Sequence, residues 1–302
     1  MYYYSLNEYL KNTFGEKVYK ISLDAGLSCP NRDGTLSDKG CIFCSKGGSG
    51  EFSANRNLSV TEQIEEAKLR LSAKTDCKKF IAYFQPFTNT YGDISYLRKI
   101  FYEAIQNESI VALSIATRPD CLGNDIIALL EEINSIKPVW IELGLQTIHK
   151  STSDYIRRCY ELSVYDEAVI RLRSIGVQII SHIILGLPYE TKEMMLQSVK
   201  YAGERSDGIK LQLLHILKDT DLLTEYNKGY FDTLSMQDYT DILCDCTEVL
   251  PPNVVIHRIT GDGDKKILVA PLWSADKKRV LNYINKTLRD RNITQGKKYL
   301  NL

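Results

Sequence analysis

Short apolar runs alternate along the chain with longer segments in which apolar residues recur at helical spacing. The short runs predict buried strands, and the longer segments predict amphipathic helices. Regular alternation of the two is typical of a parallel sheet, because a crossover helix returns the chain to the same edge before the next strand begins. The sequence therefore predicts an α/β fold.

Six strand–helix units account for most of the chain. Capping residues support the helices: Ser59 and Glu62 form a capping-box pattern, Asp93, Ser163 and Thr191 stand at N-cap positions, and Gly176 is placed as a C′ residue. The expected strands are Val18–Asp24, Phe80–Gln85, Val111–Thr117, Val139–Gln146, Gln178–Leu187 and Gly208–Leu217. The expected helices are Thr61–Lys74, Ile94–Gln106, Asp125–Ser135, Val164–Ile175 and Lys192–Arg205.

Three more elements are expected after the sixth unit, namely helix Met236–Leu250, strand Val254–Ile259 and helix Ala275–Leu288. No repeat, low-complexity tract or linker divides the chain. We therefore expect a partial (β/α)6 TIM-like barrel core over residues 1–235 and a C-terminal α/β extension over 236–302 packed on it. Ligands of such folds bind at the carboxyl ends of the strands.

Composition excludes several classes of protein. The 302 residues include 38 Lys and Arg against 38 Asp and Glu, with 44% hydrophobic residues, which excludes a disordered or uniformly basic chain. Locally the balance shifts: residues 201–250 hold ten acids and four bases, whereas 277–302 holds eight bases and one acid. A basic end is typical of RNA-binding proteins, but a solvated helix face gives the same pattern.

The sequence also indicates where the protein resides. No apolar run reaches the roughly 18 residues of a membrane span, and the first residues lack the features of a secretion signal. We therefore expect a cytoplasmic protein that does not enter a membrane. Cysteines in that compartment are reduced, and they more often bind metals or take part in catalysis than form disulfides.

Three of the eight cysteines lie together in a loop, 29–50, directly after the first strand. Cys29 and Cys41 are separated by eleven residues, and Cys41 and Cys44 by two. Thiolates two residues apart can bind one metal centre, and the turn at 31–34 can bring Cys29 beside them. A structural zinc site normally has four protein ligands, so three leave one position open. Zinc and an iron–sulfur cluster both fit this spacing.

Other candidate residues stand at the expected strand ends. The glycine-rich segment 47–50 offers backbone N–H groups to a ligand or forms a surface turn. The polar segment 83–91 suits a small polar ligand. Glu142 and Gln146 are an even number of residues apart and point to the same inward side, where they can hold ribose hydroxyls; the alternative is a buried ion pair between Glu142 and Arg118.

The remaining histidines and cysteines give weaker signals. We interpret His182, His215 and His257 as ordinary core residues, and Cys244 and Cys246 as packing residues of a helix. No phosphate-binding P-loop, nucleophile elbow, zinc-protease or dinucleotide-binding motif is present. The commonest nucleotide hydrolases, esterases, zinc proteases and dinucleotide enzymes are therefore excluded.

Seven segments spread over nearly the whole chain together carry a resemblance to a known family. They are the cysteine loop with Cys-Pro-Asn-Arg-Asp-Gly at 29–34, Ala-Tyr-Phe-Gln at 82–85, Thr-Asn-Thr-Tyr at 88–91, Thr-Arg-Pro-Asp-Cys at 117–121, Trp-Ile-Glu-Leu-Gly-Leu-Gln at 140–146, His-Ile-Ile-Leu-Gly-Leu-Pro at 182–188 and His-Arg-Ile-Thr-Gly-Asp at 257–262. With these segments the chain is similar to the YhcC/YtqA-type radical SAM proteins, which resemble the radical SAM domain of the Elongator catalytic subunit. The usual radical SAM cysteine spacing of three and two residues is replaced here by eleven and two.

The resemblance implies a [4Fe–4S] cluster and S-adenosylmethionine (SAM) as cofactors, with a reductant such as flavodoxin or ferredoxin as partner. Cleavage of SAM at the cluster would give a 5′-deoxyadenosyl radical. The implied positions are Cys29, Cys41 and Cys44 on the cluster, Thr88 and Asn89 near the methionine amine, Glu142, Gln146 and Arg158 near the ribose or carboxylate, and the backbone of Ile184, Gly186 and Pro188 near the adenine.

Two segments depart from the family pattern. Arg158-Cys159-Tyr160 stands where the family often has Arg-Gly-His, and Gln212 with His215 stands where a His-x-x-His pair is common. These differences bear on the substrate. Cys159 is either a redox-active thiol or an inert, partly buried one.

The leading functional hypothesis is a radical SAM enzyme that modifies tRNA at the wobble uridine. It is motivated by the Elongator-like segments and the basic end. The alternatives are a radical SAM enzyme with a small-molecule or protein substrate, a zinc-dependent barrel hydrolase, and a non-catalytic metal-binding interaction protein. The sequence predicts neither the residue at which catalysis begins nor the oligomeric state.

Overall fold

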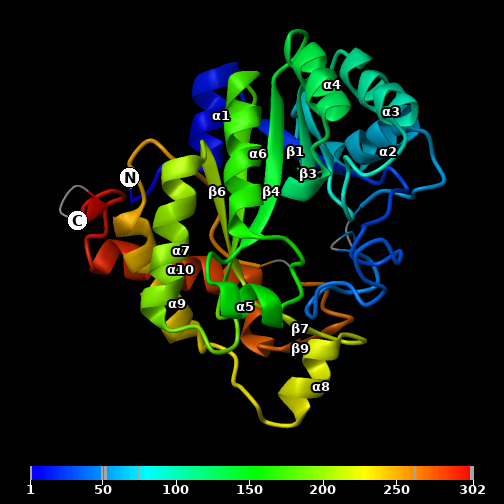
Figure 1. The fold of residues 1–302 in the computed structure, drawn as a ribbon. Coiled ribbons are helices and arrows are strands. Elements are labelled where there is room, and N and C mark those ends of the chain that lie inside the picture. Colours follow the sequence, from blue (N-terminus) through cyan, green and yellow to red (C-terminus); the bar gives the residue numbers. More distant parts are fainter. Residues whose placement is uncertain (1, 49, 51–52, 74, 262, 300–302) are drawn as a thin grey trace.

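Seven parallel strands form one curved sheet with helices on its outer face (Figure 1). The computed structural model describes residues 2–48, 50, 53–73, 75–261 and 263–299. The strand order is β1-β2-β3-β4-β5-β6-β8, so neighbouring strands follow one another in the chain except at the last position. The predicted α/β partial barrel is confirmed, and the strand predicted for the C-terminal extension completes its sheet.

The strand boundaries agree with the predicted ones at most positions. The fifth strand ends two residues earlier than expected, and the sixth ends at Leu213 instead of Leu217. The strands are β1 (Val18–Leu23), β2 (Lys79–Phe84), β3 (Ile110–Thr117), β4 (Val139–Gln146), β5 (Gln178–Leu185), β6 (Gly208–Leu213) and β8 (Val255–Arg258). The end of the predicted sixth strand forms β7 (Ile216–Leu217), which pairs with β9 (Leu268–Ala270) in a separate antiparallel ribbon.

The helices follow their capping residues. Ser59 and Glu62 form the predicted capping box, and the side chains of Asp93 and Thr191 accept from backbone N–H groups as N-caps should. Lys74, the predicted end of one helix, lies outside the described residues. The predicted helices are α2 (Val60–Ser72), α3 (Ile94–Gln106), α4 (Asn124–Asn134), α6 (Leu162–Ser174), α7 (Lys192–Arg205), α9 (Met236–Val249) and α10 (Lys277–Asp290).

Some features of the helices were predicted wrongly or missed. Ser163 is not an N-cap, because α6 begins one residue before it and Glu161 takes that position. Gly176 has a φ of 71°, the left-handed conformation expected of a C′ glycine. Three short helices had no predicted counterpart: α1 (Leu6–Phe14), α5 (Lys150–Tyr155) and α8 (Asp221–Asn227).

The inward-facing side chains of the curved sheet form layers along the strands. The layer nearest the strand starts is apolar and packs as one cluster with Leu10 of α1. This cluster contains Val18, Ile81, Ala112, Trp140 and Ile180. α1 also contacts both β1 and β8, the two edge strands. The helix therefore closes the amino-terminal end of the half-barrel.

Two residues further along the strands, the inward side chains are polar or charged. We call this set the charged layer. It consists of Lys20, Tyr83, Ser114, Glu142, His182, Lys210 and Arg258. Barrel interiors are usually filled by branched apolar residues, so a charged layer must have either internal pairing or a ligand above it.

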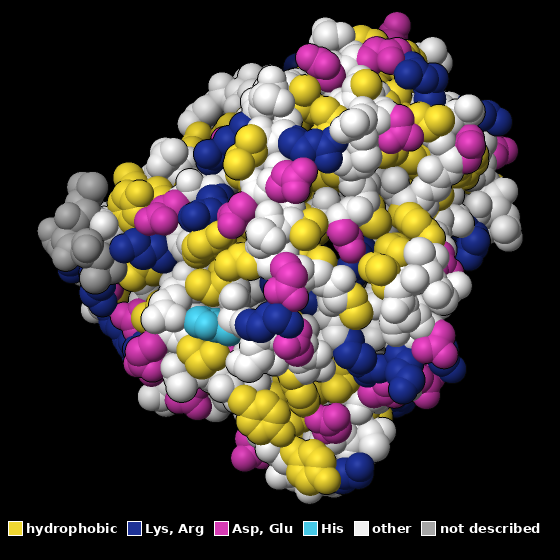
Figure 2. Space-filling view, in the orientation of Figure 1, with side chains coloured by type: hydrophobic (Ala, Val, Ile, Leu, Met, Phe, Trp, Pro, Cys, Tyr) yellow, Lys and Arg dark blue, Asp and Glu magenta, His cyan; other side chains and the backbone are white. Residues whose placement is uncertain are grey.

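The basic C-terminal end packs against acidic residues of α9. Arg291 donates to Asp241 at 2.5 Å, and Lys298 donates to Asp245 at 3.0 Å and Glu248 at 2.6 Å. Figure 2 shows basic and acidic side chains interspersed over the visible face. The local excess of bases at 277–302 is therefore partly neutralised by the local excess of acids at 201–250.

None of the helices in the described part of the chain combines the length and the hydropathy that a membrane span requires.

Candidate functional site

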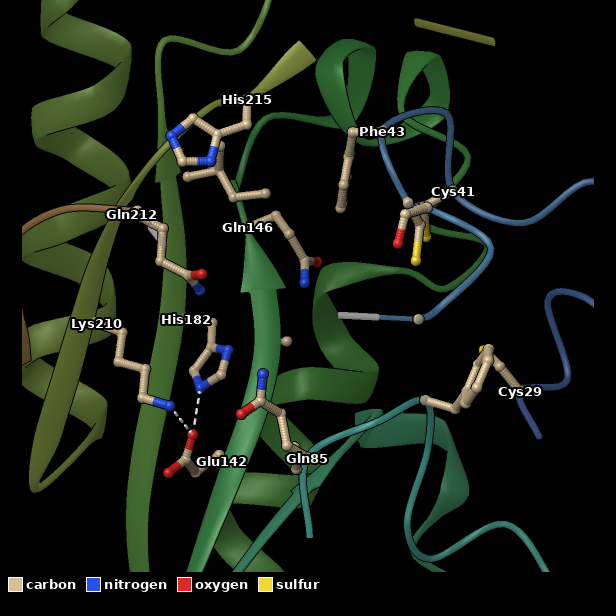
Figure 3. Close-up of a pocket in the computed structure, with 18 of the residues that line it drawn as sticks. Cys29, Cys41, Phe43, Gln85, Glu142, Gln146, His182, Lys210, Gln212 and His215 are labelled. Carbon is tan, nitrogen blue, oxygen red and sulfur yellow. Dashed lines mark hydrogen bonds and ion pairs between the residues drawn. The ribbon is translucent and has the colours of Figure 1, made fainter. Parts of the chain in front are cut away.

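A cavity of about 580 Å³ opens at the carboxyl ends of the strands. Its floor is the charged layer, from which Tyr83, Glu142, His182, Lys210 and Arg258 line it. The loop after β1 forms one wall and the ends of β5 and β6 form another (Figure 3). The cavity therefore lies where ligands bind in barrel folds.

All three predicted metal-binding cysteines line this cavity. The loop between them folds back through hydrogen bonds from Arg32 N to Cys29 O at 2.8 Å and from Cys44 N to Cys41 O at 3.0 Å. The structure thus brings Cys29 to the same cavity as Cys41 and Cys44, as the turn at 31–34 predicted. Ser49 of the glycine-rich segment lies outside the described residues, whereas Gly48 lines the cavity.

Two polar side chains fix the cysteine loop in place. Asn31 is fully buried, and its Nδ2 donates to Arg157 O at 2.7 Å and lies 3.4 Å from Cys41 Sγ. The guanidinium of Arg32 donates to the carbonyls of Cys44 at 2.6 Å and Ser45 at 2.5 Å. The positions of the thiols are therefore set by side chains of the same loop.

Burial raises the pKa of the Cys41 thiol, and it raises the pKa of the Cys44 thiol to about 12. Thiols in such surroundings stay protonated unless a bound cation deprotonates them. Arg118 lowers the pKa of Cys41 and Arg32 lowers that of Cys44, which only partly offsets burial. Over the described residues, no three His, Cys, Asp or Glu side chains are grouped so as to hold a single metal ion.

Gln146 is directed into the cavity by an irregularity at the end of β4. The pairing of β4 with β5 shifts register between Gly144 and Gln146, and Gln146 has a φ of 62°. A Cβ at Gly144 would lie 2.6 Å from Gln146 Nε2, so glycine leaves the room that this side chain occupies. The inward position predicted for Gln146 is confirmed.

The residues expected near the methionine amine differ in their surroundings. Thr88 is buried and lines the cavity. Asn89 is not among the lining residues, and its Nδ2 donates to the carbonyls of Phe84 at 3.2 Å, Pro86 at 2.9 Å and Ala116 at 3.0 Å. Asn89 therefore links the end of β2 to β3 through backbone carbonyls.

Arg158 lines the cavity, but its hydrogen bonds go to the backbone. Its guanidinium donates to Leu145 O at 3.1 Å and Thr147 O at 2.6 Å, and it also bonds to Tyr160 O. The guanidinium groups of Arg118 and Arg158 both lie over the ring of Tyr160, with centroid distances of 5.3 and 4.4 Å. These contacts were not predicted, because Arg118 and Tyr160 are far apart in the sequence.

The segment expected near adenine contributes one lining residue. Ile184 lines the cavity, whereas Gly186 and Pro188 are absent from its lining. Gly186 has a φ of 88°, and a Cβ there would lie 2.9 Å from Leu234 Cδ1. This glycine therefore allows the chain to turn closely beneath the segment that leads to α9.

Glu142 forms no ion pair with Arg118, contrary to the structural alternative considered for it. Arg118 pairs with Asp120 at 2.7 Å. Both oxygens of the fully buried Glu142 carboxylate are occupied within the charged layer: Oε1 accepts from Lys20 and from Ser114 at 2.8 Å, and Oε2 accepts from Lys210 and from His182 Nε2 at 2.7 Å. Each oxygen of this carboxylate therefore already accepts two hydrogen bonds from the protein; its predicted place near the ribose stays a prediction.

The electrostatics of the charged layer follow from burial and pairing. Burial would raise the pKa of Glu142, but Lys20 and Lys210 hold it well below its usual value. Burial lowers the pKa of Lys210 to about 7, although Glu142 opposes the shift. Burial and the charge of Lys210 lower the pKa of His182 to about 4. Glu142 is thus ionised at neutral pH and His182 is neutral.

The histidines and the two helical cysteines have different surroundings. His182 and His215 line the cavity, so the core interpretation was wrong for both. His257 packs edge-to-face on Trp140 with centroids 5.4 Å apart, as a core residue would. Cys244 and Cys246 are buried in the main core, as predicted. Cys159 is exposed, with a φ of 63°.

Lys20 and Lys210 were missed by the sequence analysis, whereas Tyr83 and Arg258 were covered only as members of the segments 83–91 and 257–262. Both lysines stand in strands that also contain other polar residues, so only the inward direction of the side chain distinguishes them. Counting inward positions strand by strand from Glu142 would have found Lys210 and Arg258, since both occupy the same layer.

Comparison with known proteins decides the family. A model of the radical SAM superfamily matches residues 34–202, and a model of the radical SAM C-terminal domain matches 206–290. The chain belongs to the radical SAM superfamily. This radical SAM chain is 44% identical in sequence to YtqA of Bacillus subtilis over 98% of its own length and 92% of the length of that protein. It is 35% identical to YhcC of Escherichia coli over 87% of this chain and 85% of that protein.

A solved structure shares the radical SAM fold. An archaeal Elp3 from Methanocaldococcus infernus superposes with a TM-score of 0.68 at 15% identity, over 92% of this chain and 64% of that one. The chain thus spans less than two thirds of the length of that neighbour. The two family models divide the chain between 202 and 206; the domain boundary predicted at 235 stays a prediction.

Proposed function

We propose that this protein holds a [4Fe–4S] cluster on Cys29, Cys41 and Cys44 and reductively cleaves SAM there. The observation that carries the proposal is the placement of these three thiols, from one loop, on the wall of a cavity at the carboxyl ends of the strands in a radical SAM chain. Three ligands leave one iron open for SAM. Bound iron would deprotonate these buried thiols, whose pKa is raised by burial.

When bound, the cluster supplies one electron to the sulfonium of SAM, which splits into methionine and a 5′-deoxyadenosyl radical that takes a hydrogen atom from the substrate. The protein positions the reactants. Asn31 and Arg32 fix the cysteine loop, and Thr88 and Gln146 offer polar groups to the ends of SAM. Ile184 and Phe43 offer apolar surface to its adenine. A flavodoxin or ferredoxin is the class of reductant that suits this role.

We further propose tRNA as the substrate, with the wobble uridine as the modified position. The support is similarity to tRNA uridine(34) acetyltransferases: the chain is 27% identical to that of Dehalococcoides mccartyi over 50% of this chain and 33% of that protein. The basic C-terminal end adds less support than its charge suggests, since Arg291 and Lys298 pair with acidic residues of α9.

Metal analysis tests the cluster. After anaerobic reconstitution we expect about four irons and four sulfides per chain, and Cys41→Ala should lose most of them. Cys159→Ala, which changes an exposed thiol, is the matched control and should keep them. Stoichiometric zinc without sulfide would refute the cluster and would favour the zinc-hydrolase or interaction-protein alternatives.

Nucleoside analysis tests the substrate. Modified nucleosides of tRNA from cells with and without the gene should differ at the wobble uridine. An unchanged profile would refute the tRNA proposal and leave the cluster proposal standing.

A further inference from the structure

The wall of the cavity opposite the cysteine loop carries hydrogen-bond donors. Lys210 and Gln212 are two residues apart on β6, so their side chains leave the strand on the same side, and both line the cavity. Arg258 of β8 is in register with Lys210 and also lines it. Figure 3 shows Lys210 and Gln212 on one side of the cavity and Cys29 and Cys41 on the other.

The charged layer beneath this wall holds two ammonium groups for one carboxylate. Lys20 and Lys210 each pair with one oxygen of Glu142, so the three groups together carry one net positive charge when both lysines are protonated. A buried net charge is costly unless a counter-ion offsets it. Burial lowers the pKa of Lys20 and of Lys210, in accord with that cost. An anion bound in the cavity would remove the imbalance.

The amide of Gln212 provides an independent indication of a ligand. It is half-buried, it points into the cavity, and it has no hydrogen bond to any residue that the structure describes. A polar side chain directed into a cavity can fix the orientation of a ligand there. Its position two residues after Lys210 on the same strand places an amide N–H and an ammonium group on the same wall of the cavity.

We propose that Lys210, Gln212 and Arg258 form an oxyanion subsite, at which a carboxylate or phosphate group of the substrate binds. The inference rests on the proposed function, because it takes the ligand to be the substrate of the SAM-dependent reaction. Ammonium, guanidinium and amide N–H groups are the donors that hold oxyanions in proteins. A substrate fixed there by its anionic end extends across the cavity toward the cysteines, where the reaction begins.

Lys20 provides a matched control for Lys210. Both lysines pair with Glu142, and both lie over the ring of Tyr83, at 4.6 and 4.5 Å from its centroid. Only Lys210 lines the cavity. A purely structural role predicts that Lys20→Met and Lys210→Met have similar effects, whereas an oxyanion subsite predicts that only Lys210→Met weakens anion binding.

The test is calorimetric titration of the oxidised, cluster-loaded protein saturated with SAM, at pH 6.5, with inorganic phosphate in one arm and acetate in the other. We expect the wild type to bind one anion per chain. Lys210→Met should weaken binding about tenfold or more, Lys20→Met by less than about threefold, and Lys210→Arg should restore most of the affinity. The arm with tighter binding identifies the group as phosphate or carboxylate.

Gln212→Leu keeps the test decisive if Lys210→Met fails to fold, because Gln212 takes no part in the ion pairs. It should weaken binding about threefold to tenfold. Absence of binding in both arms, or equal weakening by Lys20→Met and Lys210→Met, would overturn the subsite. The titration needs no SAM cleavage and can be repeated on protein without a cluster, so failure of the proposed function would be seen separately in the iron and sulfide content.

Discussion

Lys210 of β6 forms an ion pair with Glu142 of β4 across the interior of the half-barrel. Strand β5 lies between them and contributes His182, which donates to the same carboxylate oxygen at 2.7 Å. Lys20 of β1 holds the other oxygen. With Ser114 of β3 as a further donor, one carboxylate joins five strands of the sheet beneath the cavity, and the stability of this layer depends on its charge.

Loss of that charge should destabilise the protein strongly. In Glu142→Gln two buried lysines lose their counter-charge, so we expect the free energy of unfolding to fall by about 3–5 kcal/mol. Urea denaturation followed by circular dichroism measures it. Glu132→Gln is the control: Glu132 pairs with Arg98 on the exposed surface, and its loss should change the denaturation midpoint little. Equal effects of the two substitutions would contradict the central place of Glu142.

His182 should make stability depend on pH. Its folded pKa is lowered to about 4 by burial and the charge of Lys210, whereas the unfolded value is about 6.5. As pH falls from 7 to 5 the unfolded chain takes up a proton that the folded chain does not, so this contribution to stability is lost in that window, by about 2 kcal/mol. Urea titrations of the protein without cluster should show a smaller loss for His182→Gln than for the wild type. Identical pH slopes would refute the burial of a neutral His182.

Arg32 should keep the cluster in place. Because its guanidinium bonds to the carbonyls of Cys44 and Ser45, Arg32→Met frees the segment that carries two of the three proposed ligands. We expect the rate of iron loss to a chelator to rise about threefold to tenfold. Lys39→Met, an exposed cation in the same loop, should leave the rate unchanged. A rate for Arg32→Met equal to that of Lys39→Met would show that the loop needs no such anchor.

Gly144→Ala should impair SAM binding more than folding. The added Cβ would lie 2.6 Å from the amide of Gln146, which can swing aside because it is the end of a flexible side chain. The denaturation midpoint should therefore change little, while the affinity for SAM, measured by equilibrium dialysis, falls about as much as in Gln146→Leu. Wild-type affinity in both variants would place Gln146 away from SAM.

Elements with strong local signals could be predicted from the sequence. The capping box of Ser59 and Glu62 and the N-cap at Asp93 fix where α2 and α3 begin, because those side chains bond to the backbone a few residues away. The N-cap prediction at Ser163 was wrong. Serine is a common N-cap residue, but Ser163 already lies in the first turn of α6. The sixth strand was predicted to continue to Leu217 because the apolar residues continue that far. The apolar pattern does not show that the chain leaves the large sheet after Leu213 and joins the two-stranded sheet.

Only those residues of the candidate site that belong to a recognisable sequence motif could be predicted from the sequence. The spacing of Cys29, Cys41 and Cys44 predicts that the three thiols lie at one site, and the structure confirms that all three line the same cavity. No motif predicts the partners of Glu142, because Lys20 and Lys210 are far away in sequence and share with it only an inward position in the same layer of the sheet. Asn89 illustrates the opposite case: its motif position suggests a ligand, but its amide is bonded to three carbonyls of the wall.

The most direct test of the account is the formation of 5′-deoxyadenosine from SAM under anaerobic conditions by the reconstituted protein. We predict release that requires a reductant, is lost in each of Cys29→Ala, Cys41→Ala and Cys44→Ala, and persists in Cys159→Ala. No release by fully iron-loaded wild-type protein, or release that survives any one of the three ligand substitutions, would contradict it.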